Sequence, residues 1–142
     1  TNFTSGRISP NFTNVVNTFQ ISPFVKYKGL EVFGTYEAGS GRASYESSER
    51  DFGQYAVEGI YRFLPNEQAF LGARYNSASG DLGGGNSDVT INRTEISAGW
   101  FPSANLLLKL GYINQDYLDF NADDYRHEGN FNGFMVEAVV GF

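Results

Sequence analysis

The chain has 142 residues, which suits one domain, and 41% of them are hydrophobic, 16% are aromatic and none is Cys. This composition excludes disulfide bridges and thiolate metal sites, and it is too aromatic for a charge-dominated disordered chain. A formal net charge of -6 argues against nucleic acid as a partner, because neutralising phosphates requires clustered Lys and Arg. The sequence contains no run of about 18 apolar residues, so we expect no transmembrane helix.

Apolar and polar residues alternate in seven stretches, with the period of two that is typical of β-strands. In chain order the stretches are residues 19–27, 31–38, 54–63, 69–76, 93–100, 106–115 and 133–142. Apolar residues at helical spacing are almost absent, so the sequence predicts an all-β fold in a single domain. Residues 1–13 alternate poorly and are expected to form a loop or a degraded strand ahead of a meander over residues 14–142.

The connections between these stretches alternate between short and long. Short turns rich in Pro, Gly or Asn are expected at residues 28–30, 65–68 and 102–105. Longer polar connections are expected at residues 39–51, 79–88 and 119–129. Tight turns at one end and long loops at the other are typical of an antiparallel up-and-down transmembrane β-barrel. A soluble all-β barrel or sandwich is the alternative, but it gives no reason for the loops to segregate.

The two faces of the predicted sheet differ in charge. One face carries Lys26, Glu37, Glu58, Arg62, Arg74, Arg93, Glu95, Lys109 and Glu137. An Arg or Lys facing mid-bilayer costs about 2–4 kcal/mol, so we expect these side chains to line the lumen as an ion-pair network and a selectivity surface. Their near balance of charge argues against strong ion selectivity. On the other face, aromatic residues near the tight turns resemble an interfacial belt: Tyr27, Tyr61, Phe63, Trp100 and Phe142.

The end of the chain carries a more specific pattern. Apolar residues occupy every second position up to a terminal aromatic ring: Phe134, Val136, Ala138, Val140 and Phe142. This ending resembles the C-terminal β-signal of bacterial outer-membrane β-barrel proteins, and with Gly-Trp-Phe-Pro at residues 99–102 it is similar to porin-like barrels of Bacteroidetes. The resemblance implies insertion by the barrel-assembly machinery into the outer membrane of a Gram-negative bacterium, among lipid and lipopolysaccharide.

The same resemblance orients the strands and raises a question of strand number. The last strand would end in the periplasm, so the long loops and residues 1–13 would be extracellular. Bacterial single-chain barrels have an even number of strands, so seven strands predict the C-terminal part of a larger barrel. The alternative is a complete eight-stranded barrel with about ten residues per span.

The predicted function is a non-enzymatic porin or channel for passive passage of small polar solutes. The alternative is a small closed barrel with a structural or adhesive role, or a subunit of an envelope complex or homo-oligomer, acting through acidic loops. We expect no cofactor and no metal. The acidic loop that holds Asp116, Asp124 and Glu128 lacks the ligand order of an EF-hand, and His127, the only His, lacks the fixed partners of a hydrolase triad.

Overall fold

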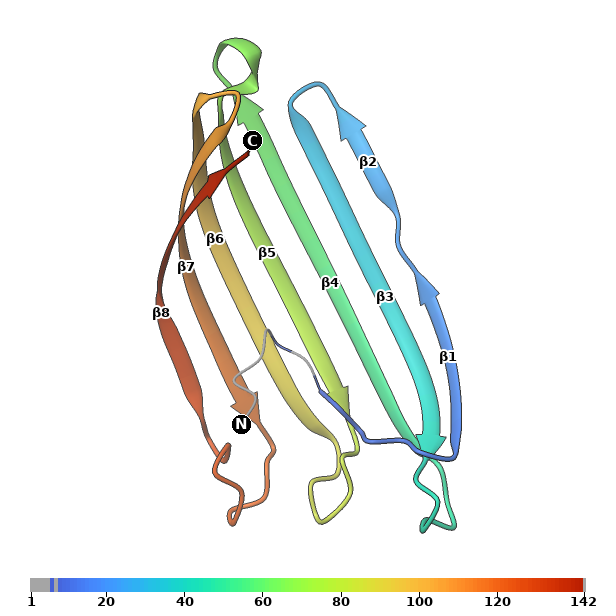
Figure 1. Ribbon diagram of the computed structural model, residues 1–142. Coiled ribbons are helices and arrows are strands. Elements are labelled where there is room, and N and C mark those ends of the chain that lie inside the picture. The colour runs from blue at the N-terminus through green and yellow to red at the C-terminus, as the bar shows by residue number, and fades with distance from the viewer. Residues whose placement is uncertain (1–5, 7, 142) are drawn as a thin grey trace.

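In the computed structural model, which describes Gly6 and residues 8–141, the chain forms one antiparallel sheet (Figure 1). The strands are β1 (Val15–Ile21), β2 (Phe24–Tyr27), β3 (Leu30–Arg42), β4 (Arg50–Phe63), β5 (Ala69–Gly80), β6 (Val89–Ser103), β7 (Leu106–Leu118) and β8 (Asn130–Val140). The helical structure of the described residues is limited to a short 3-10 turn, Pro65–Glu67. No helix in this part of the chain has the length and apolarity needed to cross a bilayer.

Successive strands pair with one another, so the sheet is a meander in the order β1-β3-β4-β5-β6-β7-β8. β1 and β2 lie end to end along β3 and together fill one position at the edge of the sheet. They are separated at Ser22 and Pro23, because proline has no N–H to donate to a ladder. The predicted all-β up-and-down meander is confirmed, with its first expected strand, residues 19–27, divided in two.

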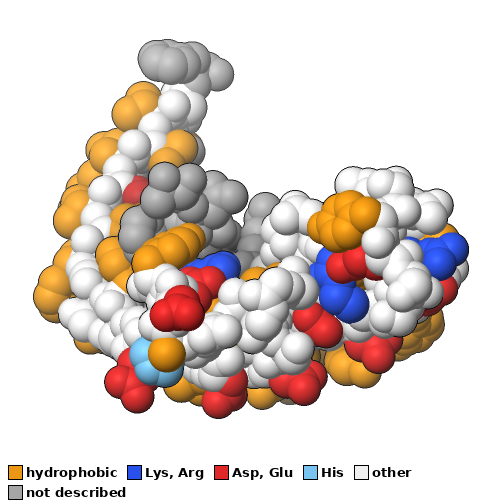
Figure 2. Space-filling view, turned by 90° about the horizontal axis from the view of Figure 1, so that it is seen from below, with side chains coloured by type: hydrophobic (Ala, Val, Ile, Leu, Met, Phe, Trp, Pro, Cys, Tyr) orange, Lys and Arg blue, Asp and Glu red, His pale blue; other side chains and the backbone are white. Residues whose placement is uncertain are grey.

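The sheet curls into a trough and is not closed into a barrel. Among the described residues, β1 and β2 at one edge and β8 at the other pair on one side only. Viewed from the end that carries the long loops, the trough is open on one side and hydrophobic side chains lie along its outer surface (Figure 2). The closed barrel predicted from the loop pattern is therefore not formed within this sheet.

At the long-loop end the strands continue further than the alternation predicts. β3 ends at Arg42, β4 begins at Arg50 and β5 ends at Gly80, so two of the long connections shrink to residues 43–49 and 81–88. The third, residues 119–129, is as expected. Hydrophobic alternation fails here because pairs such as Ser40 with Asp51 are polar, although backbone hydrogen bonds continue the ladder.

The tight turns lie at the opposite end of the sheet, as expected. Lys28 and Gly29 form a two-residue turn in which Lys28 takes a positive φ of 51°. The turn expected at residues 102–105 is confined to Ala104 and Asn105, since β6 extends to Ser103. Residues 8–14 form no strand; we call Gly6 and residues 8–13 the N-terminal strap, and Figure 1 shows its described part crossing in front of the sheet from the loop end of β1.

Candidate functional site

Strand register divides the sheet into two faces. Residues directly opposite one another in an antiparallel pair point to the same side, and the side alternates along each strand. Glu58 lies opposite Arg74, and Arg74 lies opposite Glu95, so these three share a face. The ladder places all nine charges predicted for the lumen on that same face: Lys26, Glu37, Glu58, Arg62, Arg74, Arg93, Glu95, Lys109 and Glu137. We call it the inner face, because the N-terminal strap lies on it.

Glu95 is the centre of one cluster of inner-face charges. Its carboxylate accepts a hydrogen bond from Lys109 Nζ at 3.3 Å and lies 3.7 Å from Arg93 Nη2. Lys109 also lies 3.4 Å from Glu137, which links β6, β7 and β8. Glu95, Arg93 and Lys109 are mostly buried, so their charges offset one another where little water screens them.

A second cluster forms around Glu31, which was not among the residues predicted for the site. Glu31 Oε1 accepts hydrogen bonds from Lys26 Nζ at 2.8 Å and from Arg62 Nε at 3.3 Å. Lys26 lies directly opposite Glu31 across the β2–β3 turn, and this spacing is the signal that could have identified it. Nearer the loops on the same face, Gln54 donates to Glu37 at 2.6 Å, so a neutral side chain also pairs with an inner-face carboxylate.

The outer face is apolar and exposed to the surroundings. At its middle, Leu71, Ile96 and Leu110 are 54%, 59% and 53% exposed. Aromatic residues border this face near the tight turns and near the long loops. Between these two borders, the described strands carry no charged side chain on this face. A sheet in water covers its apolar face and exposes its polar face, so this sheet has the inverse arrangement.

The first aromatic row borders the tight turns and contains the residues predicted for it. Tyr27, Tyr61, Phe63 and Trp100 lie on the outer face, and all four are exposed. We call them the turn-side row. Phe142, predicted for the same belt, lies outside the described residues.

A second aromatic row, which the sequence analysis did not identify, borders the long-loop end of the outer face. This loop-side row consists of Tyr36, Tyr55, Tyr75, Tyr112 and Phe134. Tyr55 packs on Tyr75 with ring centroids 6.0 Å apart, and Tyr112 packs on Phe134 at 5.2 Å. Along β4, Tyr55 lies about 20 Å from Tyr61 and about 26 Å from Phe63 at about 3.3 Å per residue, and the apolar band on membrane barrels is about 25 Å tall.

Beyond the loop-side row the outer face becomes polar on β7 and β8. Asn130 donates to Asp116 Oδ1 at 2.6 Å, and Asn114 donates to the other oxygen of that carboxylate at 3.0 Å. Asn132 donates in turn to Asn130 at 2.8 Å. Tyr112 and Phe134 therefore have apolar neighbours on one side and amides on the other, an arrangement typical of interfacial rings.

The loop-side row also reports the tilt of the strands. Tyr36 lies opposite Tyr55, whereas Tyr75 lies opposite Val57, two residues nearer the turns. Tyr112 lies two residues nearer again, opposite Ile96. A slip of about four residues over about five strand spacings corresponds to a tilt of roughly 30°, at about 3.3 Å per residue and about 4.8 Å per strand. Membrane barrels have strands tilted by roughly 35–45°.

The residues predicted as an assembly signal lie on β8, at the free edge of the sheet. Phe134, Val136, Ala138 and Val140 all point to the outer face. All four are exposed, Phe134 and Val136 most strongly. Phe142, the last residue of the predicted signal, lies outside the described residues.

The N-terminal strap lies on the inner face at the loop end. Arg50 donates from Nη2 to the Pro10 carbonyl at 2.9 Å, and its guanidinium lies 5.0 Å from the centre of the Phe12 ring. Further along, Asn76 Nδ2 donates to the Gly6 carbonyl at 3.1 Å. A buried apolar cluster at this end includes Val89, Ile91, Tyr117 and Phe120, with Ile8 and Leu82 packed against it. The strap therefore narrows the trough at this end.

The acidic loop between β7 and β8 is organised by an ion pair. Asp124 accepts hydrogen bonds from Arg126 at 2.7 and 2.8 Å, and these bonds hold the pKa of the Asp124 carboxyl well below its usual range. Asn86, from the preceding loop, donates to Asp124 at 3.0 Å, which joins the two loops. His127 is hydrogen-bonded through Nδ1 to the Phe120 carbonyl at 2.7 Å. In the described part of the chain no three metal-ligating side chains converge.

Comparisons with known proteins add no assignment. No family model, no curated protein and no solved structure matches the chain. The function must therefore be inferred from the two faces of the sheet and from their chemistry.

Proposed function

We propose that the chain forms part of the wall of a transmembrane β-barrel in the outer membrane of a Gram-negative bacterium, and that its inner face lines a channel for small polar solutes. The observation that supports this best is the outer face. It presents an exposed apolar band between two aromatic rows, while the charges of the same strands lie on the inner face.

Lipid is the environment that fits such a band. Burying one Val, Leu, Ile or Phe side chain away from water contributes about 1.5–3 kcal/mol, and this contribution is lost at every exposed position of the outer face in water. In hydrocarbon the same side chains are accommodated, and the tyrosines and Trp100 lie where an interface favours them.

Closure of the barrel is part of the proposal. A free strand edge cannot remain in hydrocarbon, because each unpaired backbone group there costs several kcal/mol. The edges at β1 with β2 and at β8 must therefore be paired in the membrane by further strands or by each other. We favour further strands, since a sheet of more than about eight strands leaves an aqueous lumen.

The inner face has the features expected of a channel wall. Its charges alternate in sign, so they attract water and polar solutes without strongly preferring cations or anions. Gly72, Ser97, Gly111 and Gly133 leave room between the charged side chains. The strap narrows the loop end and sets a size limit there.

Planar-bilayer conductance tests this proposal. Protein purified from outer membranes should give discrete open steps with weak ion selectivity. The double variant Arg50→Ala with Phe12→Ala should enlarge the steps by releasing the strap, whereas Tyr45→Ala, at an exposed loop residue, should leave them unchanged. The absence of discrete conductance steps from correctly folded protein would contradict the proposed channel.

A further inference from the structure

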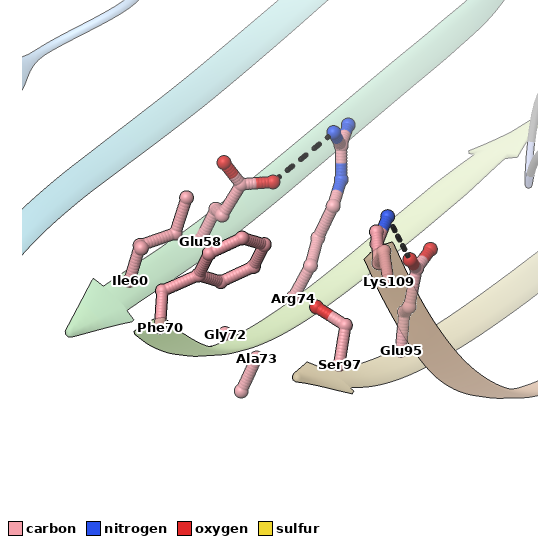
Figure 3. Close-up of a pocket in the computed structure, with 9 residues that line it drawn as sticks. All are labelled: Glu58, Ile60, Phe70, Gly72, Ala73, Arg74, Glu95, Ser97 and Lys109. Carbon is pink, nitrogen blue, oxygen red and sulfur yellow. Dashed lines mark hydrogen bonds and ion pairs between the residues drawn. The ribbon is translucent and has the colours of Figure 1, made fainter. Parts of the chain in front are cut away.

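The inner face contains a hollow of about 280 Å³ between the two aromatic rows, lined by residues from β4, β5, β6 and β7 (Figure 3). Its volume lies just below the range of about 300–1,000 Å³ for ligand pockets, so it suits only a small solute. The hollow exists because Gly72 has no side chain. A Cβ there would lie 3.1 Å from Ser97 Oγ and 3.6 Å from Ile60 Cγ1, which would fill the floor.

Apart from the Arg62 guanidinium beside Phe70, the lower wall of the hollow is apolar. The Phe70 ring lies directly over Gly99, its cross-strand neighbour, and the Arg62 guanidinium lies 5.7 Å from the ring centre. Ile60 lies opposite Gly72 on β4 and supplies an aliphatic surface. A solute that enters therefore meets a ring and an alkyl chain, which favour a solute with C–H groups on one face.

The upper rim consists of two ion pairs, one on each side. Glu58 Oε2 lies 3.6 Å from Arg74 Nη1, longer than a hydrogen bond, and Lys109 donates to Glu95 at 3.3 Å. The Arg74 side chain is 49% exposed, so its guanidinium is accessible to a solute in the open trough. Figure 3 shows the Glu58 and Arg74 side chains rising beside each other above Phe70 and Gly72.

This rim selects by its balance of charge. An anion attracted by Arg74 is repelled by Glu58, and a cation experiences the reverse, so neither gains much. A pair of neighbouring hydroxyl groups fits both partners, because a hydroxyl donates to a carboxylate and accepts from a guanidinium. The combination of an apolar wall with paired donors and acceptors matches a neutral sugar ring better than a charged solute.

We propose that this hollow is a binding subsite for a neutral, polyhydroxylated solute of about one monosaccharide unit. The ring lies against Phe70 and Ile60, and its hydroxyls bridge Glu58 and Arg74. The inference rests on the proposed channel only in that the solute reaches the site through the lumen. Binding and conduction can therefore be measured separately.

Saturation-transfer NMR tests the subsite on the full chain folded in lauryldimethylamine oxide, a detergent without a sugar headgroup. Methyl glucoside should receive magnetisation, whereas glutamine and acetate should receive little. Gly72→Val fills the floor and should abolish the transfer to the glucoside. The matched control is Gly133→Val, which also lies on the inner face but has open space around its Cβ, and it should keep the transfer.

A second variant protects the test against misfolding. Arg74→Gln replaces an exposed guanidinium with a shorter, neutral amide, and it should weaken glucoside binding by roughly tenfold, as loss of a charged hydrogen bond does. Transfer that persists in both Gly72→Val and Arg74→Gln, or that favours glutamine or acetate, would overturn the subsite. So would the absence of transfer to the glucoside in the wild-type chain. If wild-type protein conducts but does not bind the glucoside, the channel proposal stands and the sugar site fails. If it binds the glucoside but does not conduct, the sugar site stands and the channel proposal fails.

Discussion

Leu110 and Lys109 are neighbours in β7, yet the sheet places them in opposite environments. Leu110 is exposed in the middle of the outer band, while Lys109 is mostly buried between Glu95 and Glu137 on the inner face. In a water-soluble sheet the leucine would be covered and the lysine exposed. The comparison shows that alternation defines two faces, and that only the distribution of charge and aromatic rings assigns a solvent to each.

A charge introduced on the outer face should have the largest effect on stability. Leu110→Arg places a cation between the aromatic rows and should reduce the free energy of unfolding in lipid vesicles by about 2–4 kcal/mol. Met135→Arg lies on the inner face of the neighbouring strand β8 and should change the free energy of unfolding by less than about 1 kcal/mol. Urea unfolding followed by Trp100 fluorescence measures both. Equal losses for the two variants would contradict the assignment of the faces.

Two acids of the inner face that differ in burial test whether burial governs the strength of its ion pairs. Glu95→Gln removes a carboxylate that faces two cations, and should cost about 1–2 kcal/mol, since Arg93 then loses its ion pair and Lys109 keeps only Glu137. Glu137→Gln removes a carboxylate that is 43% exposed, against 18% for Glu95, and should cost about 0.5 kcal/mol or less. The same unfolding measurement applies. A larger loss for Glu137→Gln would show that burial does not govern the network.

The smallest expected effect lies in the loop between β7 and β8. Because Asp124 has a lower pKa in the folded loop than its usual 3.8, its ionised form stabilises the loop above that pH, and this stabilisation is lost as the pH falls through the folded-state value. Hydrogen-exchange protection of the Arg126 and Gly129 amides should therefore be constant from about pH 7 to about pH 5 and should decrease below about pH 3.

A matched pair of variants separates the ion pair from general acidity in that loop. Asp124→Asn should reduce protection already at neutral pH, because Arg126 loses its charged partner. Asp123→Asn removes the same charge from a residue that forms no ion pair within the described part of the chain, and should have no effect. Equal protection in the two variants would contradict stabilisation of this loop by the Asp124–Arg126 ion pair.

The sequence predicted the strands in which apolar and polar residues alternate. It did not predict the strand ends that lack this alternation. The strand at residues 106–115 appears within β7 because Leu106, Leu108 and Leu110 alternate with polar neighbours. The ends of β3 and β4 were missed because Gly39, Ser40 and Asp51 give no apolar signal, and the ladder there rests on backbone hydrogen bonds. Closure was not predictable, since it depends on what pairs with the two free edges.

The site was predictable by residue type but not by arrangement. The nine charges predicted for the lumen share one face because register preserves their side of the sheet. Their partners depend on which residues lie opposite one another, so Glu31 was missed as the acceptor for Lys26 and Arg62. The loop-side aromatic row was missed for the same reason: Tyr75 and Tyr112 are level only once strand tilt is known.

The most direct test of the central claim uses Trp100, the only tryptophan, which is 52% exposed in the turn-side row. In vesicles of brominated lipids, we expect Trp100 fluorescence to be quenched, and more strongly by bromines near the headgroups than by bromines near the bilayer centre. Met135→Trp in a Trp100→Phe background, on the inner face, should be insensitive to bromine and quenched by aqueous iodide. Iodide quenching of Trp100 without any effect of brominated lipid would contradict a lipid-facing outer surface.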